Sequence, residues 1–157
     1  MEFTVRKAVK KDVADILRLI KELAEYEKAP EEVRVTLDEL ENDGFGPNAV
    51  YSAFVAVTEN KIVGMALYYV KYSTWKGRSI YLDDIVVSEP YRRYGIGGKL
   101  IEEVVKVCKT MGVRKMDWQV LDWNEPAISF YKKYNAVFKD EWLNVTLHEK
   151  QLKDIKV

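Results

Sequence analysis

Three glycines and two arginines lie together in one short stretch, "EPYRRYGIGGKL" at positions 89–100. The stretch follows the apolar run "IYLDDIVV" and leads into a helix-like run, "LIEEVVKVCKTM". The first turn of a helix carries unpaired backbone N–H groups and a partial positive charge, which together bind anions. Glycine lets a phosphate approach such N–H groups closely, and Arg92 and Arg93 add positive charge. The stretch therefore predicts a loop that binds a phosphate or a pyrophosphate.

Two common phosphate-binding motifs do not fit this loop. The dinucleotide fingerprint Gly-x-Gly-x-x-Gly, started at Gly95, would need a glycine where Leu100 stands. The Walker motif would need a glycine in place of Arg93 and a serine or threonine in place of Leu100. The remaining alternative to a ligand site is a glycine-rich turn whose arginines are only solvated.

The composition is that of a soluble globular protein. Of 157 residues, 48% are hydrophobic and 32% are charged, which predicts one domain over residues 1–157 with a sizeable core. The formal net charge is zero, so charge gives no support for a nucleic-acid or membrane partner. The apolar runs are too short to span a bilayer, and the N-terminus lacks the apolar core of a signal peptide. The single cysteine, Cys108, fits a reducing compartment, and we expect a cytoplasmic location.

The elements that position the loop follow from hydrophobic periodicity and turn signals. The segment "EFTVRKA" (2–8) alternates as a strand does. Asp12 then opens a helix whose apolar residues recur at helical spacing as far as Leu23. The segment "TLDE" (36–39) is a capping-box pattern that starts a second, short helix, which "NDGFGP" (42–47) breaks.

The central part of the chain predicts a sheet. Three strand-like runs are "VYSAFVAVT" (50–58), "KIVGMALYYVKY" (61–72) and "SIYLDDIVVS" (79–88). Their short links predict an antiparallel meander. After the glycine loop and its helix, "KMDWQVL" (115–121) is another strand, and such a strand–helix–strand crossover makes its two strands parallel.

The last part of the chain predicts one more helix and further strands. The segment "NEPAISFYKKYN" is a helix with Asn124 as its N-cap, Pro126 in its first turn and Asn135 as a left-handed C-terminal cap. The tail "AVFKDEWLNVTLHE" (136–149) should add one or two strands. The predicted fold class is mixed α/β, a central and largely antiparallel sheet with one parallel crossover pair and helices on both faces.

The segment "RRYGIG" (92–97) resembles the acyl-CoA pyrophosphate loop of the GNAT N-acetyltransferase superfamily, whose pattern is Arg/Gln-x-x-Gly-x-Gly/Ala. Four segments resemble the diamine branch, the spermidine/spermine and thialysine acetyltransferases: "ILRLIKELAEYEKAPEE", "DGFG", "YLDDIVVSEPYRRYGIG" and "VLDWNEPAISFYKKYNA". The resemblance covers roughly residues 3–150 and implies the GNAT fold, with acetyl-CoA as co-substrate.

The resemblance implies which residues hold acetyl-CoA. Backbone N–H groups of the strand before the loop would hold the pantetheine arm, at Ile85, Val86 and Val87. The loop itself would hold the pyrophosphate, through Arg92, Arg93, Tyr94, Gly95, Ile96, Gly97 and Gly98. Asn124, at the start of the later helix, would also contact the CoA arm.

The resemblance also implies two catalytic residues. Tyr131 matches the family tyrosine near the thioester sulfur and would protonate the leaving thiolate. Asp83 stands where the diamine branch has glutamate, and it would bind the amine and receive its proton, directly or through water. Strand alternation places the neighbouring Asp84 on the other side of the sheet. The alternatives are core packing for Tyr131 and a locally hydrogen-bonded carboxylate for Asp83.

Tyr26 and Glu27 match the Tyr-Glu pair that lines the polyamine channel in this family, so the resemblance implies that they contact the substrate. Acidic residues there would attract a cation even though the net charge is zero. Glu31 and Glu32, a few residues later, are interpreted as a solvated helix end.

These features predict an enzyme, an N-acetyltransferase. It would move the acetyl group of acetyl-CoA to a primary amine of a polyamine, a diamine or a lysine analogue such as thialysine, by direct attack in a ternary complex. No metal is expected, because no cysteine and histidine cluster has metal-ligand spacing. The resemblance further implies a homodimer. The alternatives are a GNAT enzyme that acts on a protein lysine or N-terminus, and a non-catalytic regulatory module that binds CoA.

Overall fold

A computed structural model describes residues 1–156 of the chain. The chain divides into two compact units, Met1–Gln119 and the segment from Val120 onward. The first unit contains a five-stranded sheet and its helices, and the second contains two short helices. None of the described helices combines the length and the apolar character needed to cross a bilayer.

The sheet of the first unit has the strand order β1-β2-β3-β4-β5. Its strands are β1 (Thr4–Lys7), β2 (Ser52–Thr58), β3 (Lys61–Ser73), β4 (Gly77–Val87) and β5 (Met116–Asp117). Neighbours from β1 to β4 pair antiparallel, and β4 pairs with β5 in parallel through Ile80 and Tyr81. The predicted meander and the predicted parallel pair are confirmed, although β5 is shorter than the strand predicted at 115–121.

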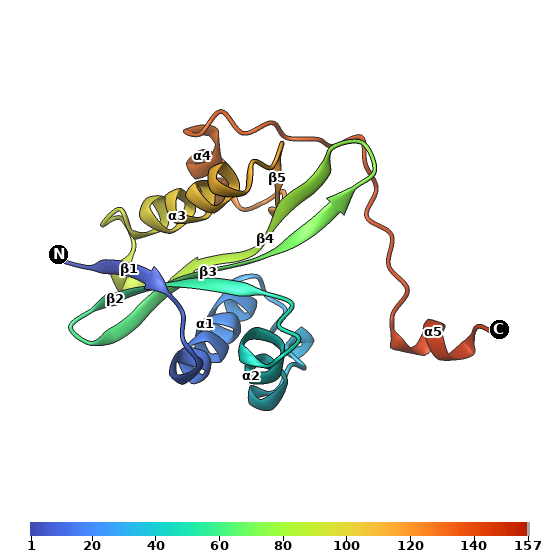
Figure 1. Cartoon of the computed structure of the whole chain (residues 1–157), viewed down its shortest axis with the longest axis horizontal. Coiled ribbons are helices and arrows are strands. Elements are labelled where there is room, and N and C mark those ends of the chain that lie inside the picture. Colours follow the sequence, from blue (N-terminus) through green and yellow to red (C-terminus); the bar gives the residue numbers. More distant parts are fainter. Residues whose placement is uncertain (157) are drawn as a thin grey trace. The chain divides into compact units, whose positions relative to one another are not determined.

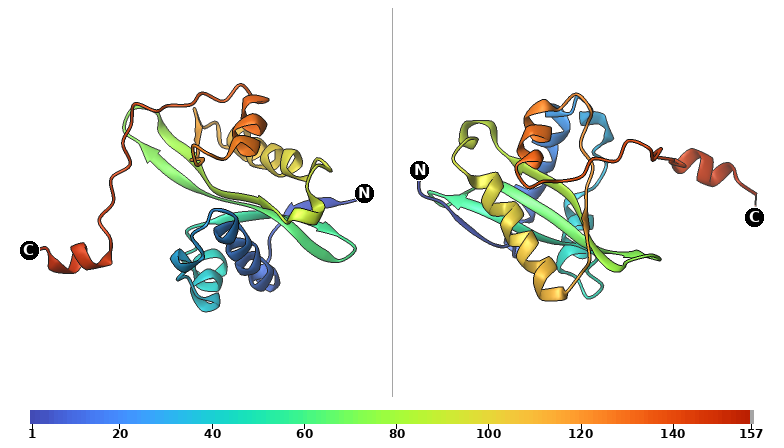
Figure 2. Two further views of the ribbon diagram at one scale, coloured as in Figure 1. Left: turned by 180° about the vertical axis from the view of Figure 1, so that it is seen from behind. Right: turned by 90° about the horizontal axis from the view of Figure 1, so that it is seen from above.

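Helices cover both faces of this sheet (Figure 1 and Figure 2). Helices α1 (Val13–Tyr26) and α2 (Leu37–Phe45) lie on one face, and α3 (Ile96–Met111) lies on the other. Three short 3-10 turns join these elements: η1 (Lys10–Asp12), η2 (Pro30–Glu32) and η3 (Glu89–Tyr91). Helix α1 buries Ile16 and Leu19 with Met65 of the sheet, and α3 buries Leu100 with Ile80. Each such side chain stabilises the fold by about 1.5–3 kcal/mol, so the sheet is held from both sides.

The start of α2 follows the predicted capping box. The Glu39 N–H donates to Thr36 Oγ1 at 3.2 Å, and the Glu39 carboxylate accepts from the Thr36 N–H at 2.8 Å. The helix ends within "NDGFGP" (42–47), as predicted, because its last residue is Phe45 and Gly46 follows. Inside that stretch, a Cβ added to Gly44 would come within 2.3 Å of the Tyr51 ring. Tyr51 packs there and donates to the Leu40 carbonyl at 2.6 Å, so Gly44 makes room for the tyrosine.

The second unit contains α4 (Glu125–Lys132) and α5 (Glu149–Asp154). Asn124 caps α4 as predicted, since its Oδ1 accepts from the Ala127 N–H at 3.3 Å. Pro126 lies in the first turn, and Asn135 has a left-handed φ of 55° beyond the helix, which confirms both predictions.

The strands predicted within 136–149 are wrong, because the structure gives this part of the described chain no strand. A strand needs a partner for its backbone N–H and C=O groups, and the described part of the second unit contains none. The apolar side chains of the segment are exposed instead, Trp142 at 66% and Leu143 and Val145 at 88%.

Candidate active site

The glycine loop carries the chain from β4 into α3. Arg93 has a φ of 68° and Gly95 a φ of 85°, both in the left-handed region. Gly95 directly precedes α3, and the first bond of the helix runs from the Lys99 N–H to the Gly95 carbonyl at 3.0 Å. The first turn has no acidic residue, and no side chain of the described residues caps it. Its N–H groups are therefore free of intrahelical partners, which is the arrangement that a phosphate ligand requires.

The base of the loop is closely packed. Ile96, the first residue of α3, is 1% exposed. A Cβ added to Gly64 of β3 would lie 2.9 Å from the Val86 carbonyl oxygen and 3.4 Å from Ile96 Cγ2. Gly64 thus lets β3, β4 and the start of α3 come together. A Cβ added to Gly95 would meet nothing within 4 Å, so only its positive φ demands glycine there.

Arg92 links the loop to the end of α1. Its Nε donates to the Val87 carbonyl at 2.9 Å, and its guanidinium carbon lies 4.9 Å from the centroid of the Tyr26 ring. The second contact is a cation–π interaction. Arg92, which was predicted to contact the pyrophosphate, thus holds the loop against Tyr26, which was predicted to contact the substrate.

The outer edge of β4 is open over most of its length. β5 pairs with β4 only at Ile80 and Tyr81, and among the described residues no strand continues this pairing along residues 82–87. An unpaired strand edge offers backbone N–H and C=O groups to an extended ligand. The edge includes Ile85, Val86 and Val87, the residues predicted to hold the pantetheine arm.

A β-bulge changes the direction of the two aspartates of β4. The adjacent residues Leu67 and Tyr68 of β3 pair with Asp84 and Leu82, so Asp83 has no residue opposite it. Leu67 belongs to the core beneath α1, and Asp84 faces the same side. Leu82 belongs to the core beneath α3, and the charge of Asp83 acts on Asp84, Tyr69 and Tyr81, so Asp83 also faces the α1 side. The prediction that Asp84 faces away from Asp83 is therefore wrong, because the extra residue interrupts the alternation.

Three carboxyl groups gather on this side of the sheet. Burial, followed by the negative charges of Asp83 and Glu27, raises the pKa of Asp84 to about 7. Burial also raises the pKa of Asp83 and the pKa of Glu27. Within residues 1–156, none of the three carboxyl groups is paired with a basic side chain. This face therefore attracts a cation, and Asp84 can exchange a proton near neutral pH.

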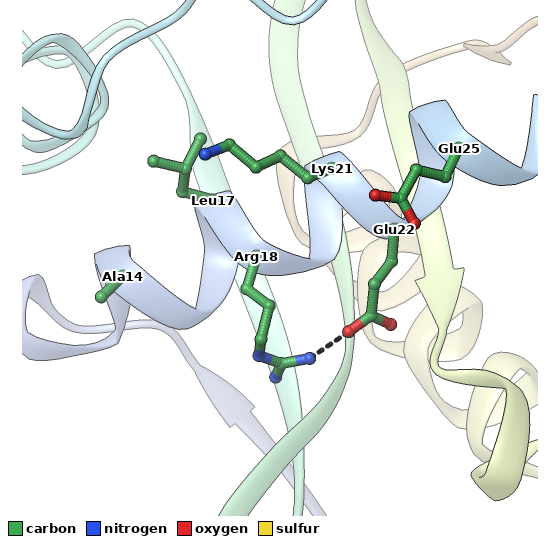
Figure 3. A pocket seen from close by; sticks show the side chains of 6 residues that line it. All are labelled: Ala14, Leu17, Arg18, Lys21, Glu22 and Glu25. Atoms are coloured by element: carbon green, nitrogen blue, oxygen red, sulfur yellow. Dashed lines mark hydrogen bonds and ion pairs between the residues drawn. The ribbon is translucent and has the colours of Figure 1, made fainter. Parts of the chain in front are cut away.

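The middle of α1 is tied to the strand end that precedes the loop. The Ser88 hydroxyl donates to Glu22 Oε2 at 2.6 Å, and Glu22 also forms an ion pair with Arg18. Figure 3 shows this ion pair beside a hollow on α1, lined by Ala14, Leu17, Arg18, Lys21, Glu22 and Glu25. The hollow contains none of the predicted site residues, and we assign it no part in the site.

The structure brings together some of the predicted site residues. Tyr26 and Glu27 lie at the end of α1, where Tyr26 contacts the glycine loop through Arg92 and the charge of Glu27 acts on Asp84. Asn124 and Tyr131 belong to the second unit. Tyr131 is 6% exposed, and its ring centroid lies 5.3 Å from that of Phe130. Its role as the acid stays a prediction.

Residues 13–136, well over half of the chain, match the acetyltransferase (GNAT) family. This chain belongs to the GNAT acetyltransferase family. It is 44% identical over 140 residues to thialysine N-epsilon-acetyltransferase of Bos taurus, which covers 84% of this chain and 82% of the relative. It is also 32% identical over 142 residues to spermidine/spermine N(1)-acetyltransferase-like protein 1 of Homo sapiens, over 86% of this chain and 20% of that protein.

A solved structure of an aminoglycoside acetyltransferase from an uncultured soil metagenomic sample has the same fold. Its TM-score is 0.77 over 93% of this chain and 97% of its own, at 22% sequence identity, a likeness that concerns the fold alone. Family and fold together confirm the predicted GNAT fold class and the predicted enzyme class, an acetyltransferase. The GNAT fold implies acetyl-CoA as co-substrate.

Sequence reasoning missed Asp84 as a member of the carboxyl cluster of this GNAT protein. The available signal was the pair itself, two adjacent aspartates inside the apolar run "IYLDDIVV". In a regular strand one of them would have to face the core beneath α3, where an unpaired carboxylate is costly. A bulge that turns both to the same side resolves this conflict.

Proposed function

We propose that this GNAT enzyme transfers the acetyl group of acetyl-CoA to a primary amine of a polyamine, a diamine or a lysine analogue such as thialysine. The observation that carries the proposal is the gathering of Glu27, Asp83 and Asp84 on one side of β4, the strand that leads into the glycine loop. A cationic amine is the ligand that such a cluster favours. The relatives, a thialysine acetyltransferase and a spermidine/spermine acetyltransferase-like protein, support an amine acceptor.

The residues of the first unit fit the co-substrate. Acetyl-CoA supplies the acetyl group as a thioester that an unprotonated amine can attack. The glycine loop would hold its pyrophosphate through the N–H groups of the first turn of α3, with Arg93 adding charge. The open edge of β4 would hold the pantetheine amides at Ile85, Val86 and Val87. Arg92 would hold the loop next to Tyr26, which is predicted to contact the substrate.

The carboxyl groups would prepare the amine. An aliphatic ammonium has a pKa near 10.4, so only roughly one molecule in a thousand is unprotonated at neutral pH. Asp84 would accept the proton, directly or through water, because its pKa of about 7 suits a general base. Asp83 and Glu27 would hold the cation beside it. The sequence placed the base at Asp83. The structure favours its neighbour, because Asp84 is the more buried and the charges of both Asp83 and Glu27 raise its pKa.

The transfer would form a C–N bond and break the C–S bond. The ammonium would give one proton to Asp84 before the attack, and the nitrogen would lose a second proton to water as the amide forms. The leaving thiolate would take a proton from the Tyr131 hydroxyl, which regains one from water. The acidic face alone does not require Tyr131. Its part rests on the resemblance and is tested separately below.

A thiol-release assay tests the proposal. Purified protein is mixed with acetyl-CoA and a panel of amines: spermidine, 1,4-diaminobutane, thialysine and a lysine-containing peptide. We expect turnover with small amines and none with the peptide. Turnover with the peptide alone would favour the alternative acceptor, a protein lysine.

Two variants test the roles of the aspartates. Asp84→Asn should lower kcat by about 10²–10⁴-fold with unchanged acetyl-CoA affinity, as expected for a general base. Asp83→Asn should mainly raise the KM for the amine, because it removes only attraction for the cation. Glu31→Gln, on η2 outside the cluster, is the matched control. Full activity of Asp84→Asn would return the base to Asp83.

We also propose a homodimer, as the resemblance implies. The exposed apolar side chains of the second unit, among them Trp142, Leu143 and Val145, support a partner surface. Light scattering on the full chain tests this, and Leu143→Asp with Val145→Asp should convert the dimer to a monomer. A monomer in the unchanged protein would contradict the proposal.

A further inference from the structure

A row of aromatic and charged side chains continues from the carboxyl groups along the hairpin of β3 and β4. Tyr69 and Tyr81 face each other across the two strands, with ring centroids 5.3 Å apart. Lys71 follows on β3, and its Nζ lies 5.2 Å from the centroid of the Tyr81 ring. Asp117 of β5 pairs with Tyr81, and its Oδ2 lies 3.9 Å from Lys71 Nζ. Strand alternation places these four side chains on the side of Asp84.

This part of the sheet is accessible. In Figure 1 the hairpin of β3 and β4 extends beyond α1 and α2, the helices that cover this face. The side chain of Lys71 is 46% exposed and that of Asp117 is 32% exposed. The charge of Asp83 contributes, after burial, to the raised pKa of Tyr69 and of Tyr81, which shows that the carboxyl cluster and the rings are neighbours.

The two ends of the row differ in charge. The Asp83–Asp84 end is acidic. At the other end Asp117 lies 2.8 Å from Lys115 Nζ, so Lys115 already balances its charge. With two lysines and one carboxylate, this end of the row has a net positive charge, which Lys71 contributes.

The spacing suits a short linear amine. Asp84 is three positions after Tyr81. At about 3.3 Å per residue, the Lys71 ammonium over the Tyr81 ring therefore lies on the order of 10 Å from the Asp84 carboxyl group. Six bonds separate the terminal nitrogen of a lysine-length molecule from its carboxylate carbon, about 7 Å when extended. With a contact of about 3 Å at each end such a molecule spans up to about 13 Å, so both groups lie within its reach.

We infer that Lys71 and Asp117 determine acceptor specificity by binding the zwitterionic head of an α-amino acid whose side chain ends in a primary amine. This inference rests on the proposed function and narrows its substrate class. Lys71 would bind the α-carboxylate. Asp117 would bind the α-ammonium through Oδ1, because its Oδ2, which lies 3.9 Å from Lys71 Nζ and 2.8 Å from Lys115 Nζ, is buried. Tyr69 and Tyr81 would line the connecting methylene or thioether chain.

A polyamine is disfavoured by the same groups. It would place a second ammonium beside Lys71, where like charges repel, and it has no carboxylate to bind there. The acidic end of the row does not discriminate, because both kinds of molecule present an ammonium to Asp83 and Asp84. Specificity therefore depends on the Lys71 end.

The test compares amino acids with their decarboxylated partners in the thiol-release assay. The pairs are lysine and 1,5-diaminopentane, ornithine and 1,4-diaminobutane, and thialysine and bis(2-aminoethyl) sulfide. The unchanged protein should have a higher kcat/KM for the amino acid in at least one pair. Lys71→Met, which keeps the packing on Tyr81 but loses the charge, should lower that value about tenfold and change the diamine value less than twofold. Lys71→Glu should reverse the preference.

Matched controls and the possible outcomes keep this inference distinct from the proposed function. Lys61→Met removes a charge at the opposite end of β3 and should leave the ratio of the two kcat/KM values unchanged. No turnover with any amine would overturn the proposed function and this inference with it. Turnover with the same ratio in the unchanged protein, Lys71→Met and Lys71→Glu would overturn the inference alone. A preference of the unchanged protein for all three diamines would do so too.

Discussion

Protonation of Asp84 should affect the stability of this enzyme as well as its activity. Its pKa is about 7 in the folded protein, against an ordinary value of 3.8. Between these two values the folded state binds one more proton than the unfolded state. The free energy of unfolding therefore falls as the pH rises from about 4 to about 7 and is level above that. A pKa difference of about 3 corresponds to about 4 kcal/mol, which is the upper limit for the cost of ionising Asp84 in place.

The substitution Asp84→Asn removes this cost, because the amide cannot ionise. At pH 5 the variant should already be more stable by about 1.5 kcal/mol, since Asp84 is then protonated in the folded state but ionised in the unfolded state. At pH 8.5 the variant should be more stable by 2 to about 4 kcal/mol. The assay is urea unfolding followed by tryptophan fluorescence at several pH values from 5 to 8.5. Asp140→Asn, at an exposed position of the second unit, is the control and should show no such trend.

Two outcomes would refute the reasoning about Asp84. A stability gain that is the same at pH 5 and pH 8.5 would show that its carboxyl group titrates alike in the folded and unfolded states. A loss of stability at pH 8.5 would show that hydrogen bonds hold the ionised carboxylate. The expected result, a protein that is more stable and less active, is typical of a residue kept for function at a cost in stability.

Three further changes give separate predictions. Gly95→Ala should lower the free energy of unfolding by about 1 kcal/mol, because alanine is strained at a φ of 85°. The same change should weaken acetyl-CoA binding, measured by calorimetry, at least tenfold. Asp12→Asn should cost about 2–3 kcal/mol at pH 7, because the 3% exposed Asp12 carboxylate accepts from Arg6 at 2.6 and 3.0 Å and from the Val9 N–H at 2.8 Å. The Arg6 hydrogen bond lowers the pKa of Asp12 in the folded protein. The stability that Asp12 contributes is therefore present above about pH 4 and is lost as the pH falls through this lowered pKa. If the variant and the unchanged protein unfolded at the same acid pH, this prediction would be contradicted. Tyr131→Phe should lower kcat more than acetyl-CoA affinity, and an unchanged rate would remove Tyr131 from the mechanism.

Local signals predicted much of the fold. The capping box at Thr36, the cap at Asn124 and the left-handed Asn135 depend on residues within four positions of one another, so the sequence alone is enough to identify them. The glycine loop was predictable for the same reason, because its φ angles and its helix start lie within one short stretch.

Features that depend on distant residues could not be predicted. The bulge at Asp83 arises from the register between β3 and β4, which no single strand contains. The role of Gly44 depends on Tyr51, which follows the helix and whose ring occupies the space that a Cβ at Gly44 would need. The tail residues Leu143 and Val145 alternate as a strand would, yet alternation supplies no backbone partner. The sequence thus identified the loop and Glu27 as candidates for the site, and their roles stay predictions, whereas the direction of Asp84 could not be derived from it.

The bulge also has a consequence for evolution. Deleting the codon for Asp83 would restore regular pairing, with Leu82 and Asp84 still opposite Tyr68 and Leu67 and no other residue displaced. The outcome would be an intact sheet with one acid fewer at the amine. A single in-frame deletion could therefore convert this transferase into a folded relative with altered chemistry, and the reverse insertion could restore it.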